Sequence, residues 1–408
     1  MADNGIVATA GGVTAAQGFR AAGVRCGIKQ SGPDLALICS DVECSAAGVF
    51  TTNAFKAAPV VVSQERLSSG RARAIVANSG NANACTGQQG LCDARRACEL
   101  AAAAMNIEPE SVLCASTGII GVPLPMDKLE AGIRTAAAEL SQDGGDAASL
   151  AIMTTDTHPK TSACEIEPNS TGLECAVRVG GMCKGAGMIA PNLATMLCFV
   201  TTDAAIDSSL LARCLRSNVE RSFNCLTIDG DMSTNDSVIA LANGRAGCAP
   251  IADGTRAYEA FDRALGQVLM DLAQAIARDG EGATKYVEVH VVNAASYGDA
   301  KAAAMSVANS PLVKTAIFGE DPNWGRVLCA VGRSGARVVP ERTSLRFGEV
   351  RIVENGEPLN VEPEAARRPM LEKDLIITID LGVGDSSAVA FTCDFSYDYI
   401  KINAEYHT

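Results

Sequence analysis

The chain has 408 residues, enough for two packed domains or for one large domain with an added lobe, and 48% of it is hydrophobic, as in ordinary globular proteins. Its 47 acidic and 34 basic side chains give a net charge of −13, which repels phosphate and anionic lipid and argues against a nucleic-acid partner. No window approaches about 18 uncharged apolar residues, and the first residues lack the basic start and apolar run of a signal peptide, so we expect no membrane span and a cytoplasmic location.

Runs of apolar and β-branched residues predict the strands, and apolar residues at three- and four-residue steps predict the helices. In residues 255–278, for example, Phe261, Leu265 and Leu272 share one helical face, and Gly280 follows as a stop. The elements lack the regular alternation of a doubly wound sheet, so the pattern predicts a layered α/β or α+β architecture. In chain order we expect strands at 34–39, 72–77 and 195–201, helices at 208–223 and 255–278, and strands at 286–292 and 375–381.

The sixteen cysteines are scattered along the chain and include no C-x-x-C pair. The closest two, Cys39 and Cys44, have four residues between them, and the three histidines are far apart in sequence. Zinc sites usually have paired, tightly spaced ligands, and a cytoplasmic protein keeps most thiols reduced. We therefore expect neither a metal site nor disulfides, and we expect the cysteines to act as small buried hydrophobic residues.

Residues 229–236, DGDMSTND, resemble a calcium-binding loop only at first sight. A calcium loop of the EF-hand type needs glycine at its sixth position and glutamate at its twelfth, where Thr234 and Ala240 stand. This excludes an EF-hand and leaves two alternatives, a polar turn and a loop beside an active site.

The glycine cluster 180–187 carries Lys184 and matches no nucleotide-binding pattern, and we expect it to form a loop. It leads through Pro191, which breaks regular structure, to Ala194 and Thr195 at the start of an apolar strand. A threonine at a strand start is ordinarily just a β-branched residue, so only its surroundings can mark Thr195 as functional.

Those surroundings, and most of the chain, resemble the ornithine acetyltransferase family, the ArgJ enzymes of arginine biosynthesis, also known as bifunctional glutamate N-acetyltransferases. The resemblance runs nearly from end to end, and its motifs are long and in the same order. They are GGVTAAQGFRAAGV (11–24), FTTNAFKAAPV (50–60), NSGNANACTG (78–87), ASTGIIG (115–121), MTTDT (153–157), APNLATM (190–196), FNCLTIDGDMSTNDS (223–237), GEDPNWGR (319–326) and YIKINAEYHT (399–408).

The resemblance implies the fold that this family shares with DmpA-type aminopeptidases, in which mixed sheets are sandwiched between helices. It also implies self-cleavage between Ala194 and Thr195. The products are an α chain, residues 1–194, and a β chain, residues 195–408, that begins with the nucleophile Thr195. Cleavage gives that threonine an α-amine with an ordinary pKa of about 7.7–8, which supplies the base that a weak hydroxyl nucleophile needs.

The resemblance further implies the roles of other site residues. Thr117 and Gly118 form the oxyanion hole, although without the family match Ser116–Gly118 is typical of a turn. Lys184 and Glu281 bind the charged groups of the substrate, and one of the adjacent Thr154 and Thr155 makes a further polar contact. Without the match, Glu281 is a typical solvated loop charge. The remaining substrate contacts fall on Thr195 itself and, through an inward-turned C-terminal tail, on Asn403 and Thr408.

The implied reaction is a ping-pong transfer of acetyl from N2-acetylornithine to Thr195 and then to glutamate, which releases ornithine and N-acetylglutamate. It requires no metal and no cofactor. Many family members also accept acetyl-CoA as donor, and that alternative stays open here. The family typically assembles as an α2β2 heterotetramer. Two other readings compete: a self-cleaving aminopeptidase, which usually has serine as nucleophile, and an uncut binding protein without activity.

Overall fold

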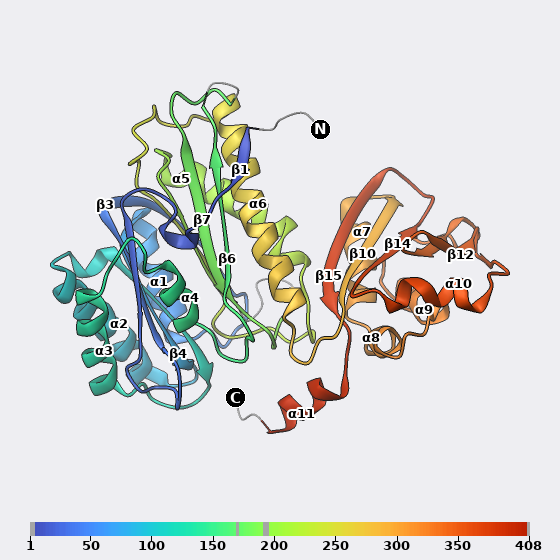
Figure 1. Ribbon diagram of the computed structural model, residues 1–408, viewed down its shortest axis with the longest axis horizontal. Coiled ribbons are helices and arrows are strands. Elements are labelled where there is room, and N and C mark those ends of the chain that lie inside the picture. The colour runs from blue at the N-terminus through green and yellow to red at the C-terminus, as the bar shows by residue number, and fades with distance from the viewer. Residues whose placement is uncertain (1–4, 169–170, 191–195, 406–408) are drawn as a thin grey trace.

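The computed structural model describes residues 5–168, 171–190 and 196–405, which form a large lobe and a smaller C-terminal lobe (Figure 1). The large lobe is built on a nine-stranded sheet with the order β1-β6-β7-β8-β9-β3-β4-β5, to which β2 adds by pairing with β3. Pairs β4–β5 and β8–β9 are parallel and the others are antiparallel. The strands are β1 (Ile6–Ala8), β2 (Phe19–Val24), β3 (Leu35–Phe50), β4 (Arg71–Asn81), β5 (Val112–Ile119), β6 (Lys160–Ile166), β7 (Val177–Lys184), β8 (Leu197–Thr202) and β9 (Ser237–Ala242).

The smaller lobe is a six-stranded mixed sheet with the order β13-β12-β11-β14-β10-β15. Helix α7 (Tyr297–Ala308) covers one of its faces, and the side chains of Val287, Val289 and Val291 pack in the core of this lobe. The strands are β10 (Tyr286–Ala294), β11 (Ser344–Phe347), β12 (Val350–Glu354), β13 (Glu357–Pro358), β14 (Asp374–Asp380) and β15 (Ser386–Cys393).

Helices cover the two outer faces of the large lobe. Successive side chains of a strand point to opposite faces, so in β8 Cys198 and Val200 pack in a cluster with α5 and α6, while Leu197 and Phe199 join the inner cluster. The inner cluster also includes Ile75 of β4. The opposite face of β4 packs against α1–α3. The helices are α1 (Ala58–Arg66), α2 (Gly87–Met105), α3 (Met126–Ala138), α4 (Gly145–Ala151), α5 (Ser208–Arg221), α6 (Arg256–Arg278), α7 (Tyr297–Ala308), α8 (Pro311–Phe318), α9 (Trp324–Gly332), α10 (Pro363–Arg367) and α11 (Tyr397–Glu405).

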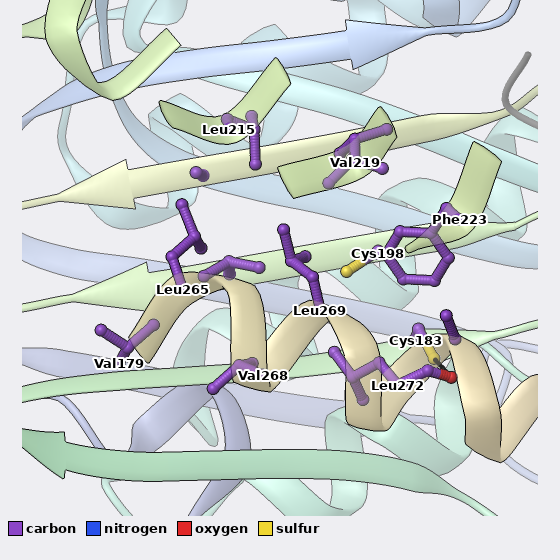
Figure 2. Packing of buried hydrophobic residues seen from close by; sticks show 14 of the residues in the cluster. Val179, Cys183, Cys198, Leu215, Val219, Phe223, Leu265, Val268, Leu269 and Leu272 are labelled. Carbon is purple, nitrogen blue, oxygen red and sulfur yellow. Dashed lines mark hydrogen bonds between the residues drawn. The ribbon is translucent and has the colours of Figure 1, made fainter. Parts of the chain in front are cut away.

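Helix α6 shows why these residues fold as they do. The Thr255 hydroxyl caps it by accepting the N–H of Tyr258 over 3.2 Å. Helix α6 lies over β6 and β7, and its apolar side chains, among them Leu265, Val268 and Leu272, pack with Val179 and Cys183 of β7 (Figure 2). Each buried leucine or valine contributes roughly 1.5–3 kcal/mol, so this face fixes the helix on the sheet.

The predicted layered architecture is confirmed, and each predicted element overlaps an observed one. The helix predicted at 208–223 ends at Arg221, since Phe223 begins a short 3₁₀ turn, and the strand predicted from 195 is described from Leu197 onward. Within the described residues, no helix combines the length and the apolar character that crossing a membrane requires.

The expected glycine-rich loop is wrong for residues 180–184, the first five of the eight residues in the cluster. Gly180 and Gly181 lie inside β7, and Lys184 is the last residue of that strand. A Cβ at Gly180 would stand only 1.9 Å from the carbonyl oxygen of Gly12. The glycine therefore allows the N-terminal segment to pack directly on the strand, and the loop begins only at Gly185.

The expectation for the cysteines is wrong for one pair. Cys175 and Cys248 form a disulfide, with Cα atoms 5.7 Å apart although 73 residues separate them. Folding brings these two loops together, and sequence spacing cannot reveal such a pair. Ten of the fourteen other cysteines are buried, as expected, and the described residues include no group of side chains that could hold a metal ion.

Candidate active site

A cavity of about 130 Å³ lies where several segments of the chain converge. The ends of β5 and β7, the loop after α4, residues 229–236, the turn after α6 and helix α11 all contribute to its wall. Seven residues that the sequence marked as site candidates line it: Thr117, Gly118, Thr154, Thr155, Lys184, Glu281 and Asn403. The other three, Ala194, Thr195 and Thr408, lie outside the described residues.

Thr117 and Gly118 lie near the end of β5, so the reading of this segment as an ordinary turn is wrong. Gly118 has φ +131°, and a Cβ there would stand 2.4 Å from the carbonyl carbon of Gly80 on β4. Only glycine fits this close approach of two backbones. The side chain of Asn235 holds the same strand end, since its Nδ2 donates to the carbonyl of Ser116 over 2.8 Å.

Lys184 is 2% exposed and lines the cavity. Burial lowers its pKa, and the carboxylates of Asp156, Glu281 and Asp236 oppose that effect. Among the described residues, no hydrogen-bond or ion-pair partner lies within reach of its Nζ. A buried amine with no direct partner, beside a cavity, can pair with an anionic ligand.

A buried ion network stands behind Lys184. Lys160 Nζ lies 2.7 Å from Oδ1 of Asp156 and 2.5 Å from Oδ2 of Asp279. Burial disfavours the charged form of Asp156, but Lys184 and Lys160 outweigh it and lower the pKa of this carboxyl to about 2. Asp156 also accepts the N–H groups of Thr154 and Gly185, over 3.0 and 2.7 Å. Asp156 thus joins the loop that carries Thr154 and Thr155 to the end of β7, where Lys184 lies.

Glu281 follows the C-terminus of α6 and is only 9% exposed, so the reading of it as a solvated loop charge is wrong. Its N–H donates to the carbonyl of Ala186 over 2.8 Å. A Cβ at Gly187 would stand 2.4 Å from Glu281 Cδ, so this glycine makes room for the carboxylate. The glycine cluster thus serves Glu281 as well as Lys184.

Helix α11 follows β15 of the smaller lobe and runs back toward the large lobe, at the lower edge of the view in Figure 1. Phe395 stacks on Tyr399 with ring centroids 4.5 Å apart, and Ser396 Oγ donates to the carbonyl of Gly282 over 2.5 Å. These contacts place Asn403 on the cavity, where its Nδ2 donates to Glu281 Oε2 over 2.8 Å. The C-terminal tail is therefore helical and inward-turned as far as Glu405.

Sequence reasoning named residues 229–236 only as a possible neighbour of an active site. Asp231, Ser233 and Asn235 line the cavity, so of the two alternatives the loop beside the site is the right one. Sequence reasoning did not identify Asp156 or Lys160 as part of the site. Asp156 lies in the quoted motif MTTDT, but only the fold shows that Lys160 and Asp279 meet it.

Comparison with known proteins gives consistent matches. The model of the ArgJ family matches residues 20–408. The chain is 54% identical over 402 residues to the arginine biosynthesis bifunctional protein ArgJ of Symbiobacterium thermophilum, covering 98% of this chain and 99% of the relative. The crystal structure of the arginine biosynthesis bifunctional protein ArgJ from Bacillus halodurans has a TM-score of 0.50 and 41% identity, covering 51% of this chain and 98% of that chain. The ornithine acetyltransferase from Mycobacterium tuberculosis, solved in complex with ornithine, has a TM-score of 0.42 and 43% identity, covering 47% of this chain and 100% of that chain.

Proposed function

The chain belongs to the ArgJ family of arginine biosynthesis, and from this premise we propose that it is a self-cleaving enzyme that carries the acetyl group on Thr195. As a family member it is an ornithine acetyltransferase, that is, a glutamate N-acetyltransferase. The observation that carries the mechanism is the convergence of seven candidate residues from distant parts of the chain on one cavity.

The first step is cleavage of the precursor. The Thr195 hydroxyl attacks the carbonyl carbon of Ala194, the peptide nitrogen leaves as the α-amine of Thr195, and water hydrolyses the resulting ester. This restores the hydroxyl and leaves a carboxyl group on Ala194. The length of the Bacillus halodurans chain supports this step. The match covers 98% of that chain but only 51% of this one, so that chain is about half as long. A protein cut near its middle has chains of about that length.

The two products remain one body. The cut separates β7 from β8, which are neighbours in the large sheet and pair from Val179–Thr202 to Lys184–Leu197. The backbone bonds of this pair, and those of β9 with β3, bind the α chain to the β chain. A strand pair in the middle of a sheet is buried on both faces, so cleavage does not release the halves. Two such αβ units give the proposed α2β2 assembly.

Acetyl transfer then runs in two half-reactions. The hydroxyl of Thr195 attacks the acetyl carbonyl of N2-acetylornithine while the α-amine takes its proton and passes it to the departing amine of ornithine. Glutamate next attacks the acetyl ester and leaves as N-acetylglutamate. Thr117 and Gly118 stabilise both oxyanions, a contribution whose loss typically costs about 2.7–4 kcal/mol per donor.

Charge complementarity orients the substrate. The α-carboxylate of acetylornithine pairs with Lys184, whose amine has no direct partner among the described residues. The ammonium at the other end of the substrate pairs with Glu281, which Asn403 holds in place. One of Thr154 and Thr155 contributes a polar contact, as do Asn403 and the C-terminal Thr408.

The relatives are called bifunctional, and we propose glutamate acetylation from acetyl-CoA as the second activity. The same acetyl-Thr195 serves both donors, so only the donor half-reaction differs. The measurement is N-acetylglutamate formation from acetyl-CoA and glutamate without acetylornithine. No product there, with normal transfer from acetylornithine, removes this second activity.

The test of the main proposal combines mass and turnover. Intact-mass and N-terminal analysis of the wild-type chain should give fragments of 194 and 214 residues, the second beginning Thr-Met-Leu-Cys. Thr195→Ala should stay whole and transfer no acetyl. Normal cleavage in that variant contradicts the assignment of the nucleophile. Release of amines from aminoacyl amides would instead favour the aminopeptidase, and a folded, uncut, inactive wild type would favour the binding protein.

A further inference from the structure

Two carboxylates on one loop hold the two flanks of the cleavage segment. We propose that Asp229 and Asp236, with the backbone of residues 228–237 between and beside them, form a clamp that presents the peptide bond before Thr195 for self-cleavage. The inference rests on the proposed function and adds two positioning residues to it.

The upstream flank is held by Asp229. This half-buried carboxylate accepts the N–H of Met188 over 2.6 Å and the N–H of Ile189 over 2.8 Å, one on each oxygen. The carbonyl of Ile189 in turn accepts the N–H of Ile228 over 2.8 Å. Met188 has φ +56°, a backbone conformation that bulky residues adopt only where surrounding bonds maintain it. The bonds to Asp229 supply that restraint.

The downstream flank is held in the same way by Asp236. Its Oδ1 accepts the N–H of Met196, the residue after the nucleophile, over 2.9 Å. The carbonyl of Met196 accepts the N–H of Ser237 over 3.1 Å. On each flank, therefore, one residue is fixed through both its N–H and its carbonyl, by a loop carboxylate and by the backbone next to that carboxylate.

The loop itself is anchored firmly enough to serve as a clamp. The N–H of Thr51 donates to the carbonyl of Asp236 over 3.0 Å, and the Thr51 hydroxyl donates to the carbonyl of Ser233 over 2.8 Å. The N–H of Ala57 donates to the carbonyl of Thr234 over 2.8 Å. Residues can hold reacting groups in a productive geometry only when those residues are themselves fixed by other contacts.

The two carboxylates differ in a way that the test can use. Asp236 is fully buried, and among the described residues its Oδ2 has no hydrogen-bond partner. Burial raises the pKa of Asp236 well above its usual range. An asparagine there keeps the oxygen that accepts from Met196, and its amide nitrogen takes the place of the Oδ2 that has no partner among the described residues. An asparagine at 229 places an amide N–H against the N–H of either Met188 or Ile189, so one bond is lost.

Asp203 provides a matched control at the opposite end of β8. It is also fully buried and accepts two backbone N–H groups from separate segments, those of Gln17 over 2.9 Å and Arg178 over 2.7 Å. Substitutions at 203 therefore cause comparable disturbance to the same strand without touching the flanks of the cut.

The experiment follows cleavage of the full chain after cell-free synthesis, by intact mass against time. Asp229→Ala, Asp236→Ala and Asp229→Asn should be cut at least about tenfold more slowly than Asp203→Ala and Asp203→Asn, because displacement of reacting groups by about 1 Å costs on the order of 100-fold. Asp236→Asn should be cut within about threefold of wild type, which also keeps the test valid if the alanine variants fail to fold.

Each result decides a different question. Cleavage of both alanine variants at the rate of Asp203→Ala, with wild type cut normally, overturns the clamp and leaves the proposed function intact. An Asp236→Asn chain as slow as Asp236→Ala overturns the positioning role of Asp236. A wild-type chain that folds but is never cut overturns the proposed function and the clamp together. In cut enzyme, Asp236→Ala should lower kcat with little change in KM, since the variant loses the bond that holds Met196, the residue after the nucleophile, and keeps the substrate-binding side chains.

Discussion

Asn403 of helix α11 donates its side-chain N–H to Glu281 Oε2 over 2.8 Å, and so joins the C-terminal tail of the chain to the turn after α6 at the wall of the cavity. The two residues are 122 positions apart in sequence. The bond explains why a tail that follows the smaller lobe takes part in a site of the larger one.

Removing the carboxylate should affect substrate binding more than processing. In Glu281→Ala we expect KM for acetylornithine to rise about 10- to 100-fold, as expected for a lost hydrogen bond to a charged group of about 1.5–3 kcal/mol. Self-cleavage should stay normal, since the carboxylate only packs on Gly187 in the upstream flank, and the backbone bond from Glu281 to Ala186 remains in the variant. Failure of cleavage in this variant would show that Glu281 is structural or part of the processing site.

Asn403→Ala should reproduce a milder form of that defect. Without the amide, the Glu281 carboxylate loses its fixed orientation, and KM for acetylornithine should rise while kcat changes little. Lys401→Ala is the control, because Lys401 is exposed on the same helix and lies away from this cavity. Equal KM values in the two variants would mean that Asn403 does not orient Glu281.

Gly187→Ala should disturb Glu281 without deleting any polar group. The added Cβ would stand 2.4 Å from Glu281 Cδ, so the carboxylate must move away. We expect KM for acetylornithine to rise as in Glu281→Ala. Gly332→Ala is the matched control, since a Cβ there meets nothing within 4 Å and lies in helix α9, where alanine is preferred to glycine by up to about 1 kcal/mol. Unchanged KM in Gly187→Ala would contradict the close packing of the two residues.

Local patterns predicted the elements better than the packing between them. The helix predicted at 255–278 was correct to within a residue because its apolar period and its cap at Thr255 are both local in sequence. The glycines of β7 were misread as a loop because their packing partners are distant in sequence: Gly180 packs on Gly12, nearly 170 residues away, and Gly181 packs on α6. The Cys175–Cys248 disulfide was missed for the same kind of reason.

The candidate site shows the same limit. Its residues were named through the family resemblance, and no local pattern distinguishes Glu281 or Thr117 from ordinary loop and turn residues. Physical reasoning on the sequence had no way to find that Asp156 and Asp279 share Lys160, since this network exists only after β6 and α6 have packed together.

The network predicts a large stability effect. Asp156→Asn leaves Lys160 buried with Asp279 as its remaining carboxylate partner, and breaking a buried ion pair typically costs about 3–5 kcal/mol. The measurement is the free energy of denaturant unfolding, with and without Asp156→Asn, in the Thr195→Ala background. That protein stays uncut, so unfolding involves a single chain. Glu43→Gln is the control, since the Arg71–Glu43 pair is exposed and such pairs contribute about 0–1 kcal/mol. Similar losses in the two variants would contradict the importance of the buried network.

The same carboxyl predicts how this stability depends on pH. The pKa of Asp156 is about 2 in the folded protein, below the value of about 3.9 for an unfolded aspartate. A depressed folded pKa means that the stabilisation is fully present above pH about 4 and is lost as pH falls toward 2, because the unfolded chain then binds the proton first. Asp156→Asn lacks this ionisation. Since the other carboxylates titrate alike in both proteins, the difference in unfolding free energy between wild type and variant should be constant from pH 7 to 5 and shrink from pH 4 to 2. A difference that stays constant down to pH 2 would show that Asp156 stabilises the fold by packing and neutral hydrogen bonds, and that its charge contributes nothing.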